Sequence, residues 1–214
     1  MSFDTLAPYY RAMETVSAGN VQQRCRTSFL SETIGCRRAL LLGEGPGRFL
    51  VELLRANPHV EVTCVERSAR MIQEALSHVK HQGLDTARIT VEQQDVLTWR
   101  PLVGAFDLVS THFFLDCFRR DELEGVVTKV GVSATSEARW LLADFRVPER
   151  GWRRWRARGI LALLYGFFRV TTGLSASQLT PPDDLLRAAG FRLAQRRLAN
   201  SGLVHSDLWF KTNP

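Results

Sequence analysis

The stretch from Leu40 to Phe49, LLLGEGPGRF, decides the predicted fold of this 214-residue chain. An apolar strand ends at Gly43, glycines recur at alternate positions up to Gly47, and an amphipathic helix is predicted from Phe49 to Ala56. Glycine lets a backbone turn at positive φ and lets a ligand approach it closely. A strand, a glycine-rich turn and a helix N-terminus together form a cradle for a nucleotide-type ligand.

A second strand completes this signal. It is predicted over Val60–Val65 and ends in Glu66, which lies 23 residues after Gly43. A carboxylate at the end of the second parallel strand is placed to accept two hydrogen bonds from a ribose diol. The loop and the carboxylate together indicate a cofactor that contains adenosine.

The loop departs from the dinucleotide-binding fingerprint G-x-G-x-x-G/A, whose last small residue allows close packing around a pyrophosphate. Here the spacing is G-x-G-x-G, and Arg48 stands at the sixth position. This arginine disfavours a dinucleotide and hydride transfer. The loop resembles instead that of class I S-adenosylmethionine-dependent methyltransferases, whose cofactor carries no phosphate.

The resemblance extends from about residue 38 to the C-terminus. Glu66–Met71 is similar to the acid-x-Ser-x-x-Met stretch of this family, Gln94–Val96 to its adenine-binding aspartate, and Ala105–Ser110 to its Phe-Asp-Leu-Val strand. The resemblance implies S-adenosylmethionine as cofactor, held by Gly43, Glu44, Gly45, Gly47, Glu66, Arg67, Met71, Asp95, Val96, Thr111 and His112. Many members have an acidic residue where this chain has Leu41; Glu44 either takes over part of its role or is a solvated loop carboxylate.

The order of elements predicts a Rossmann-like α/β fold: a doubly wound seven-stranded sheet, mostly parallel, with a C-terminal antiparallel hairpin. The whole chain, 1–214, is expected to form one domain. The predicted strands are 39–42, 60–65, 88–93, 106–110, 139–145, 191–198 and 203–211, and the predicted helices between them are 49–56, 69–82, 121–130 and 181–190.

Two segments lie outside this alternation. Residues 1–36 are predicted to be helical, and by resemblance they form a lid in which Tyr10 faces the methyl donor; the alternative is an anchoring aromatic residue. Residues 148–181 are expected to be a helical insertion on the substrate side, with five arginines and two tryptophans over 150–158 followed by an apolar run. The stretch 150–168 either touches a membrane surface, caps a pocket for an apolar substrate, or packs on the sheet as an ordinary helix.

The catalytic candidates follow the fourth strand, because acceptors approach the carboxyl ends of the strands in this architecture. His112 is a candidate general base, since its ordinary pKa suits that task, and Asp116 is a candidate to orient it. The alternative is that His112 only lines the cofactor pocket. Positioning alone supplies much of the acceleration in methyl transfer, so few reactive side chains are required.

Composition limits the remaining possibilities. The start of the chain lacks the basic and apolar pattern of a secretion signal, and Cys25, Cys36, Cys64 and Cys117 are scattered, which favours a reduced, cytoplasmic protein without disulfides. No His, Cys or Asp cluster has metal-ligand spacing, so no metal is predicted. The net charge of +6 permits a nucleic-acid or anionic-membrane partner without requiring one.

Three functions are compatible with these features. The first is methyl transfer to a small, lipophilic or aromatic acceptor. The second is methylation of RNA or another nucleic acid, which is disfavoured because the stretch after the fourth strand, Ser110–Phe113, contains no proline and Cys117 follows Asp116 in place of proline. The third is a non-catalytic binding protein with this fold, against which the retained glycines and acids argue. The sequence does not indicate the oligomeric state.

Overall fold

A computed structural model describes residues 19–172 and 179–212. Within them, the strands form one seven-stranded sheet in the order β3-β2-β1-β4-β5-β7-β6. The strand pairs among β1 to β5 are all parallel, and β7 runs antiparallel to both β5 and β6. This confirms the predicted Rossmann-like fold with its C-terminal antiparallel hairpin. The strands are β1 Arg38–Leu42, β2 Glu61–Val65, β3 Ile89–Glu92, β4 Phe106–His112, β5 Ala134–Phe145, β6 Phe191–Ala199 and β7 Val204–Lys211.

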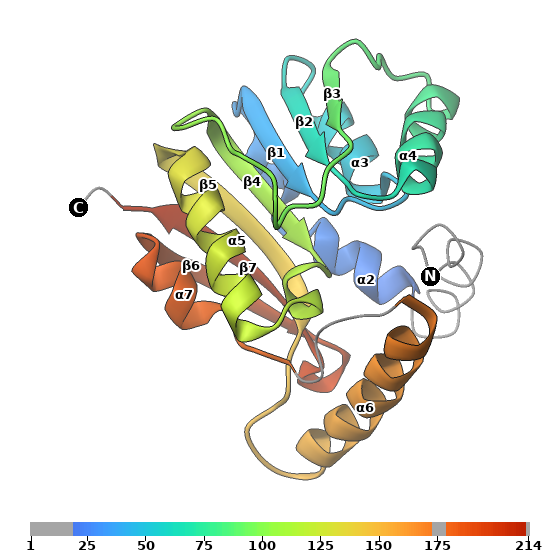
Figure 1. Cartoon of the computed structure of the whole chain (residues 1–214), viewed down its shortest axis with the longest axis vertical. Coiled ribbons are helices and arrows are strands. Elements are labelled where there is room, and N and C mark those ends of the chain that lie inside the picture. The colour runs from blue at the N-terminus through green and yellow to red at the C-terminus, as the bar shows by residue number, and fades with distance from the viewer. Residues whose placement is uncertain (1–18, 173–178, 213–214) are drawn as a thin grey trace.

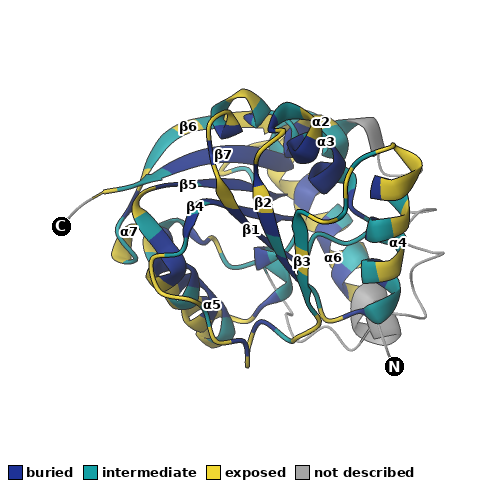
Figure 2. Ribbon diagram, turned by 90° about the horizontal axis from the view of Figure 1, so that it is seen from above, coloured by how far each residue is buried: buried dark blue, intermediate teal, exposed yellow. Residues whose placement is uncertain are grey.

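Helices cover both faces of the sheet. Figure 2 shows α2 and α3 on one face and α5 and α7 on the other. Helix α6 lies apart, beyond the carboxyl ends of the parallel strands (Figure 1). The described helices are α2 Gly19–Arg26, α3 Arg48–Ala56, α4 Ala69–His81, α5 Arg120–Ser133, α6 Trp152–Thr172 and α7 Asp183–Ala188, with short 3-10 turns η2 Leu30–Thr33, η3 Leu115–Cys117 and η4 Asn200–Gly202.

Two predicted strands are longer in the structure than the sequence indicated. Strand β4 continues to His112 because Thr111 and His112 still pair with Leu142 and Ala143 of β5. Strand β5 begins at Ala134, directly after α5, and not at Arg139 as predicted. Its first residues, Ala-Thr-Ser-Glu, are small or polar, and only Ala134 among them is buried, so they lack the apolar pattern that reveals a strand.

The central strands are buried on both sides. Along β1, Leu40 and Leu42 pack with Trp140 and the helices of one face, while Leu41 packs with Phe49 under α3 on the other. Near-continuous apolar strands are expected when a parallel sheet has two covered faces. Leu41 is fully buried, so the position that is acidic in many methyltransferases belongs here to the hydrophobic core.

No helix among the described residues combines the length and the apolar character needed to cross a bilayer.

Candidate active site

The loop after β1 turns on glycines that have left-handed backbone angles. Gly43, Gly45 and Gly47 have φ values of 63°, 64° and 79°. A Cβ on Gly43 would lie 2.1 Å from the Phe114 ring, and one on Gly47 would lie 2.9 Å from the Ala75 backbone, whereas one on Gly45 would meet nothing within 4 Å. Gly43 and Gly47 therefore allow close packing, and Gly45 leaves space beside the loop.

Glu44 caps helix α3. Its Oε1 accepts hydrogen bonds from the backbone N–H groups of Phe49 at 2.8 Å and Leu50 at 2.9 Å. Burial raises the pKa of Glu44 to about 7, against these two hydrogen bonds and the nearby Arg26 charge, which lower it. The amides at a helix N-terminus are the groups that bind a phosphate. In this protein a carboxylate already occupies them, which disfavours a pyrophosphate at the same place.

Glu66 lies directly after β2 and faces the same loop. Its Oε1 accepts a hydrogen bond from Ser68 N at 2.9 Å, and its Oε2 accepts one from Gly45 N at 3.4 Å. Burial raises the pKa of the Glu66 carboxyl group. Ser68 in turn caps α4 by accepting a hydrogen bond from Met71 N at 3.2 Å. The carboxylate is thus fixed at the loop, with Met71 buried in the first turn of α4.

A pocket opens between the glycine loop, the end of β2 and helix α4. Its lining combines two carboxylates with apolar walls and contains neither lysine nor arginine: Glu44, Gly45, Leu50, Cys64, Glu66, Ile72, Ala75, Leu76, Ile89 and Val91. A carboxylate suits the hydroxyls of a ribose. The lining offers this acceptor and no basic group for a phosphate, which is the donor set expected for a cofactor without phosphate.

The predicted adenine-side residues lie after β3. Arg67 Nη1 and Asp95 Oδ2 form an ion pair at 3.3 Å, which joins the ends of β2 and β3. The other oxygen of Asp95 accepts a hydrogen bond from Leu97 N at 2.9 Å. The Val96 side chain is buried in the core, so it is not available to contact a ligand.

At the end of β4, Thr111 and His112 have different environments. Thr111 Oγ1 accepts a hydrogen bond from Trp140 Nε1 at 2.8 Å and is fully buried, so its side chain supports the core. His112 Nδ1 lies 3.0 Å from Ser110 Oγ, and its ring packs edge-to-face on Phe49 at 4.5 Å. Burial and the Arg26 charge lower the pKa of His112 to about 3. At neutral pH the imidazole is therefore uncharged and a weak base.

Asp116 contacts a second aspartate that the sequence analysis did not single out. Asp144, near the end of β5, accepts a hydrogen bond from Asp116 N at 3.1 Å, and the two carboxyl groups are hydrogen-bonded to each other. Burial raises the pKa of both groups, and raises that of Asp144 well above its ordinary value. Two buried carboxyl groups in contact favour a state in which one of them keeps its proton, because two neighbouring negative charges repel each other.

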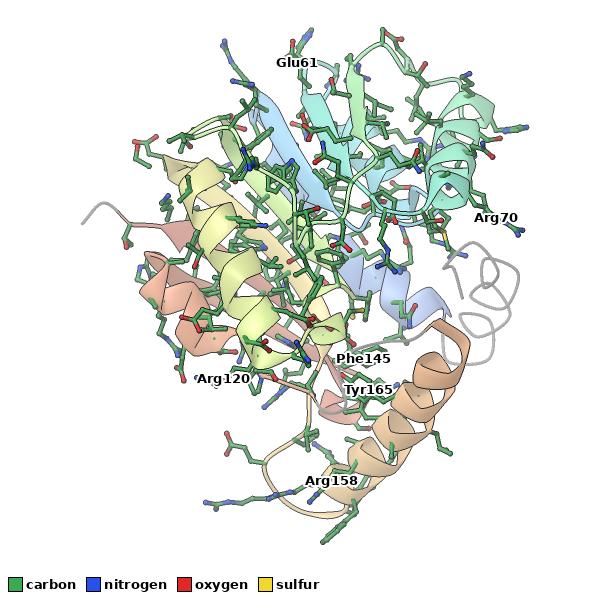
Figure 3. The ribbon with its side chains drawn as sticks, in the orientation of Figure 1. Glu61, Arg70, Arg120, Phe145, Arg158 and Tyr165 are labelled. Carbon is green, nitrogen blue, oxygen red and sulfur yellow. The ribbon has the colours of Figure 1, made fainter. Side chains whose placement is uncertain are left out.

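Helix α6 contributes to the same place. The Tyr165 hydroxyl donates a hydrogen bond to the Asp116 carbonyl oxygen at 3.3 Å. Figure 3 shows Tyr165 beside Phe145, between α6 and the sheet. Phe113, in a left-handed conformation with φ 54°, packs in the same apolar cluster, and the Arg26 guanidinium lies 5.0 Å from its ring. The structure thus brings Asp116, Asp144, Tyr165 and Phe113 together where an acceptor would approach.

Tyr10 lies outside the described residues. Of the predicted lid, 1–36, residues 19–36 are described, and Arg26 of α2 is buried against the loop side of the sheet. Arg26 and Asp144 are the site residues that sequence reasoning missed. Asp144 had a visible signal, since it stands at the carboxyl end of a predicted strand. In the part of the chain that the structure describes, no group of three His, Cys, Asp or Glu residues is placed to hold a metal ion.

Comparison with known proteins agrees with this geometry. Residues 39–131 match the family model described as a methyltransferase domain. This match covers 93 of the 214 residues, and within it the chain is similar to a methyltransferase domain. The matched range contains the glycine loop, Glu66, Asp95 and all of β4. No curated protein sequence matches the chain significantly.

Several solved structures share the fold of this chain. The mitomycin 7-O-methyltransferase is 19% identical with a TM-score of 0.73; the match covers 99% of this chain and 61% of that one. The 1,6-didemethyltoxoflavin-N1-methyltransferase of Burkholderia thailandensis, solved with S-adenosylhomocysteine bound, is 17% identical with a TM-score of 0.69 over 98% of this chain and 86% of that one. A [4+2]-cyclase is 16% identical with a TM-score of 0.65 over 90% and 81%. The domain spans about three fifths of the first of these proteins.

Proposed function

We propose that the protein transfers a methyl group from S-adenosylmethionine to a small, lipophilic or aromatic acceptor. The observation that carries this proposal is the cradle formed by Glu44, Gly45 and Glu66, in which the α3 amides are already capped and no lysine or arginine lines the pocket. Two of the compared structures are named as methyltransferases of small molecules. Their names support the substrate class proposed here.

The chain's own residues would hold the cofactor at three points. Glu66 accepts hydrogen bonds from the ribose hydroxyls, and the space beside Gly45 admits the ligand close to the backbone. Asp95, held by Arg67, faces the adenine amino group from the end of β3. Bound S-adenosylmethionine supplies a methyl group on a sulfonium, and transfer requires the acceptor atom, the methyl carbon and the sulfur in line.

The acceptor region lies over β4 and β5. Asp116 and Asp144 contact each other there, and as transfer proceeds an acceptor O–H or N–H passes its proton to whichever carboxyl group of the pair is ionised. His112, whose ring is neutral, lines the pocket in this proposal. Asp116, Tyr10 and His112 are the three residues to test for a catalytic role. Phe113, Phe145 and Tyr165 give the region an apolar wall, which favours a lipophilic acceptor.

The remaining predictions stay part of the proposal: a single domain, cytoplasmic location, a lid formed by 1–36, and membrane contact through 150–168. The fold is also that of a [4+2]-cyclase, so a reaction other than methyl transfer is the second candidate for this pocket. Nucleic-acid methylation has no supporting feature among the described residues at the end of β4.

Calorimetric titration with S-adenosylmethionine and S-adenosylhomocysteine tests the proposal. We expect micromolar binding of both, and at least about tenfold weaker binding by Glu66→Ala, since a hydrogen bond to a charged group contributes about 1.5–3 kcal/mol. Glu61→Ala is the matched control, because Glu61 is an exposed carboxylate at the start of the same strand. Binding that is unaffected by Glu66→Ala, or absent in the native protein, would overturn the cofactor assignment.

If the cofactor binds, the next assay incubates the protein with labelled S-adenosylmethionine and a panel of quinols, phenols and aromatic amines. Label transfer to one of them supports methyl transfer, and Asp144→Asn should lower the turnover at least about tenfold with unchanged cofactor affinity. Binding without transfer to any acceptor, including RNA, would favour the alternative of a protein that uses the fold without methylation.

A further inference from the structure

Helix α6 packs on the protein through one narrow stripe. Ala157, Leu161 and Tyr165 are 1%, 5% and 7% exposed and recur at intervals of four residues, which places them on one side of the helix. They belong to an apolar cluster with the ends of β4 and β5 and with Cys25 of α2. This stripe fixes which side of α6 faces the protein.

The opposite side of α6 is also apolar. Trp152, Trp155 and Leu163 are 64%, 72% and 77% exposed. At 3.6 residues per turn they lie on the side away from the buried stripe, together with Gly159 and Ala162. A surface helix of a globular protein carries charged and polar residues at these positions. Two large tryptophans and a leucine on the outward side therefore need a partner of their own.

Arg153, Arg156 and Arg158 lie on or beside this outward face, whereas Arg154 lies on the side of the buried stripe. Arg153, Arg154, Arg156 and Arg158 are exposed in the first half of the helix, and Figure 3 shows Arg158 in the part of α6 farther from the sheet than Tyr165. Two of them donate hydrogen bonds to uncharged oxygens: Arg154 to the Glu149 carbonyl oxygen at 3.2 Å, and Arg156 to Asn200 Oδ1 at 2.9 Å. Among the described residues none of the four forms an ion pair with a carboxylate, and the sequence has no acidic residue from Gly151 to Pro182.

We propose that α6 docks on an anionic lipid surface. Trp152, Trp155 and Leu163 enter the boundary between headgroups and acyl chains, and the bordering arginines contact the lipid phosphates. Tryptophan favours this boundary because its ring is apolar and its N–H finds water or headgroup partners. Basic residues on an amphipathic helix attract it to anionic lipids. A nucleic acid would satisfy the arginines, but it would leave the outward apolar stripe in water.

Docking through α6 would bring a lipid surface near the proposed acceptor site. The same helix that carries Trp155 on its outer side carries Tyr165 on its inner side, where the tyrosine hydroxyl bonds Asp116 O. A lipophilic acceptor leaving the membrane would reach this end of the sheet over a short path. The docking itself rests on exposure and charge and does not depend on methyl transfer.

Co-sedimentation of the full-length protein with vesicles tests the proposal. One set of vesicles is phosphatidylcholine alone, and the other contains about a third phosphatidylglycerol, in about 0.1 M salt. We expect at least about tenfold stronger binding to the anionic vesicles. The triple variant Trp152→Ser, Trp155→Ser, Leu163→Ser should lose this binding, and Arg153→Gln with Arg158→Gln should weaken it and reduce its salt dependence.

The matched control is Leu102→Ser with Val103→Ser. These residues are 61% and 81% exposed, but they precede β4, at the opposite end of the sheet from α6. The control should bind vesicles like the native protein. Circular dichroism and S-adenosylhomocysteine binding of each variant show that the fold and the cofactor pocket are intact.

Three outcomes would overturn the proposal. One is native protein that does not bind anionic vesicles, and another is a triple variant that binds as well as the native protein. The third is a concentration-dependent dimer, seen by analytical ultracentrifugation and abolished by the triple variant, with no vesicle binding; it would assign the outward face of α6 to a second copy of the chain.

Discussion

At the residue scale, Gly45 and Gly47 have the same kind of backbone but different surroundings. A Cβ at Gly47 would approach the Ala75 backbone to 2.9 Å, and one at Gly45 would meet nothing within 4 Å. We expect Gly47→Ala to destabilise the protein by about 3 kcal/mol, from left-handed strain and a backbone clash, and Gly45→Ala by about 1 kcal/mol, from strain alone. Urea unfolding of the two variants measures this difference; equal losses would show that α4 moves aside freely.

The same two variants separate stability from binding. Gly45 borders the proposed ligand space, so Gly45→Ala should weaken S-adenosylhomocysteine binding although it costs little stability. A Gly45→Ala protein that binds the cofactor as tightly as the native chain would place the ligand away from this loop.

Glu44 gives the protein a pH dependence with a defined sign. Its pKa in the folded state is about 7, above the ordinary value of 4.5, mainly because of burial. The folded state therefore holds the proton more tightly than the unfolded state. The stabilisation of the folded state by Glu44 is complete below pH 4.5 and is lost as the pH rises through 7. The size of the pKa shift sets an upper limit of about 3 kcal/mol on the free energy of unfolding that is lost.

Glu44→Gln should remove this dependence, because the amide oxygen still accepts the two α3 N–H groups and carries no charge. We expect the variant to gain stability relative to the native protein between pH 5 and pH 8, measured by urea unfolding at both values. Glu52→Gln, on the outer side of α3, is the control and should show no such trend. If the stability of Glu44→Gln depends on pH as that of the native protein does, the pH dependence comes from other acids, such as Asp144.

What the sequence could predict at this scale was the type of residue at a position and not its partner. Glu44 and Glu66 contact the backbone of the glycine loop and of α3, and Asp95 pairs with Arg67 after β3. That Glu44 caps α3 depends on the turn made by Gly43, Gly45 and Gly47. The Asp116–Asp144 pair joins residues 28 positions apart, and their contact follows from the register of β4 and β5, which one sequence does not contain.

At the scale of elements, the apolar strands were predicted within a few residues of their observed ends. Burial on both faces gives β1 and β2 continuous apolar runs, and Ser68 marks the start of α4 by capping it. The first half of β5 was missed because its residues are small or polar, and the two buried ones, Ala134 and Ala138, give no strong apolar pattern. Where a strand is not buried, its sequence has no hydrophobic pattern from which the strand could be predicted.

The C-terminal hairpin depends on one buried charge. Asp207 of β7 is 0% exposed, and Arg196 of β6 donates to both its oxygens, at 2.7 Å and 2.6 Å. Although burial opposes it, hydrogen bonds from Arg196 and His205 lower the pKa of Asp207. Its stabilising contribution is therefore present above the ordinary pKa of 3.8 and is lost as the pH falls below it.

Arg196→Met should destabilise the protein by about 3–5 kcal/mol at pH 7, since it leaves a buried carboxylate with only His205 and the Trp209 N–H group beside it. The double variant Arg196→Met, Asp207→Asn should recover part of this loss. Thermal unfolding measures the stability of these variants. Arg192→Met is the control, because Arg192 is an exposed arginine of the same strand. A loss below about 1 kcal/mol would mean that water or a shifted side chain compensates Asp207 once Arg196 is gone.

At the scale of the whole molecule, the proposed functions gather at one end of the sheet. The glycine loop, Glu66, Asp95, the Asp116–Asp144 pair and α6 all follow or cover the carboxyl ends of parallel strands (Figure 1). Ligands bind at this end because the strand order reverses there and leaves a crevice between the loops. Here the reversal lies between β1 and β4. From β1 the sheet continues to β2 and β3 on one side, and to β4 and β5 on the other.

This arrangement predicts how ligands change the stability of the entire chain. A ligand at about 100 times its dissociation constant stabilises the folded state by about 2.7 kcal/mol. We expect S-adenosylhomocysteine to raise the unfolding temperature accordingly, and to have little effect on Glu66→Ala at the same concentration. NADH should leave the unfolding temperature unchanged, because Glu44 occupies the α3 amides that a pyrophosphate would need. A larger shift with NADH than with S-adenosylhomocysteine would mean that Glu44 yields its place to phosphate, and it would make hydride transfer the reaction to test.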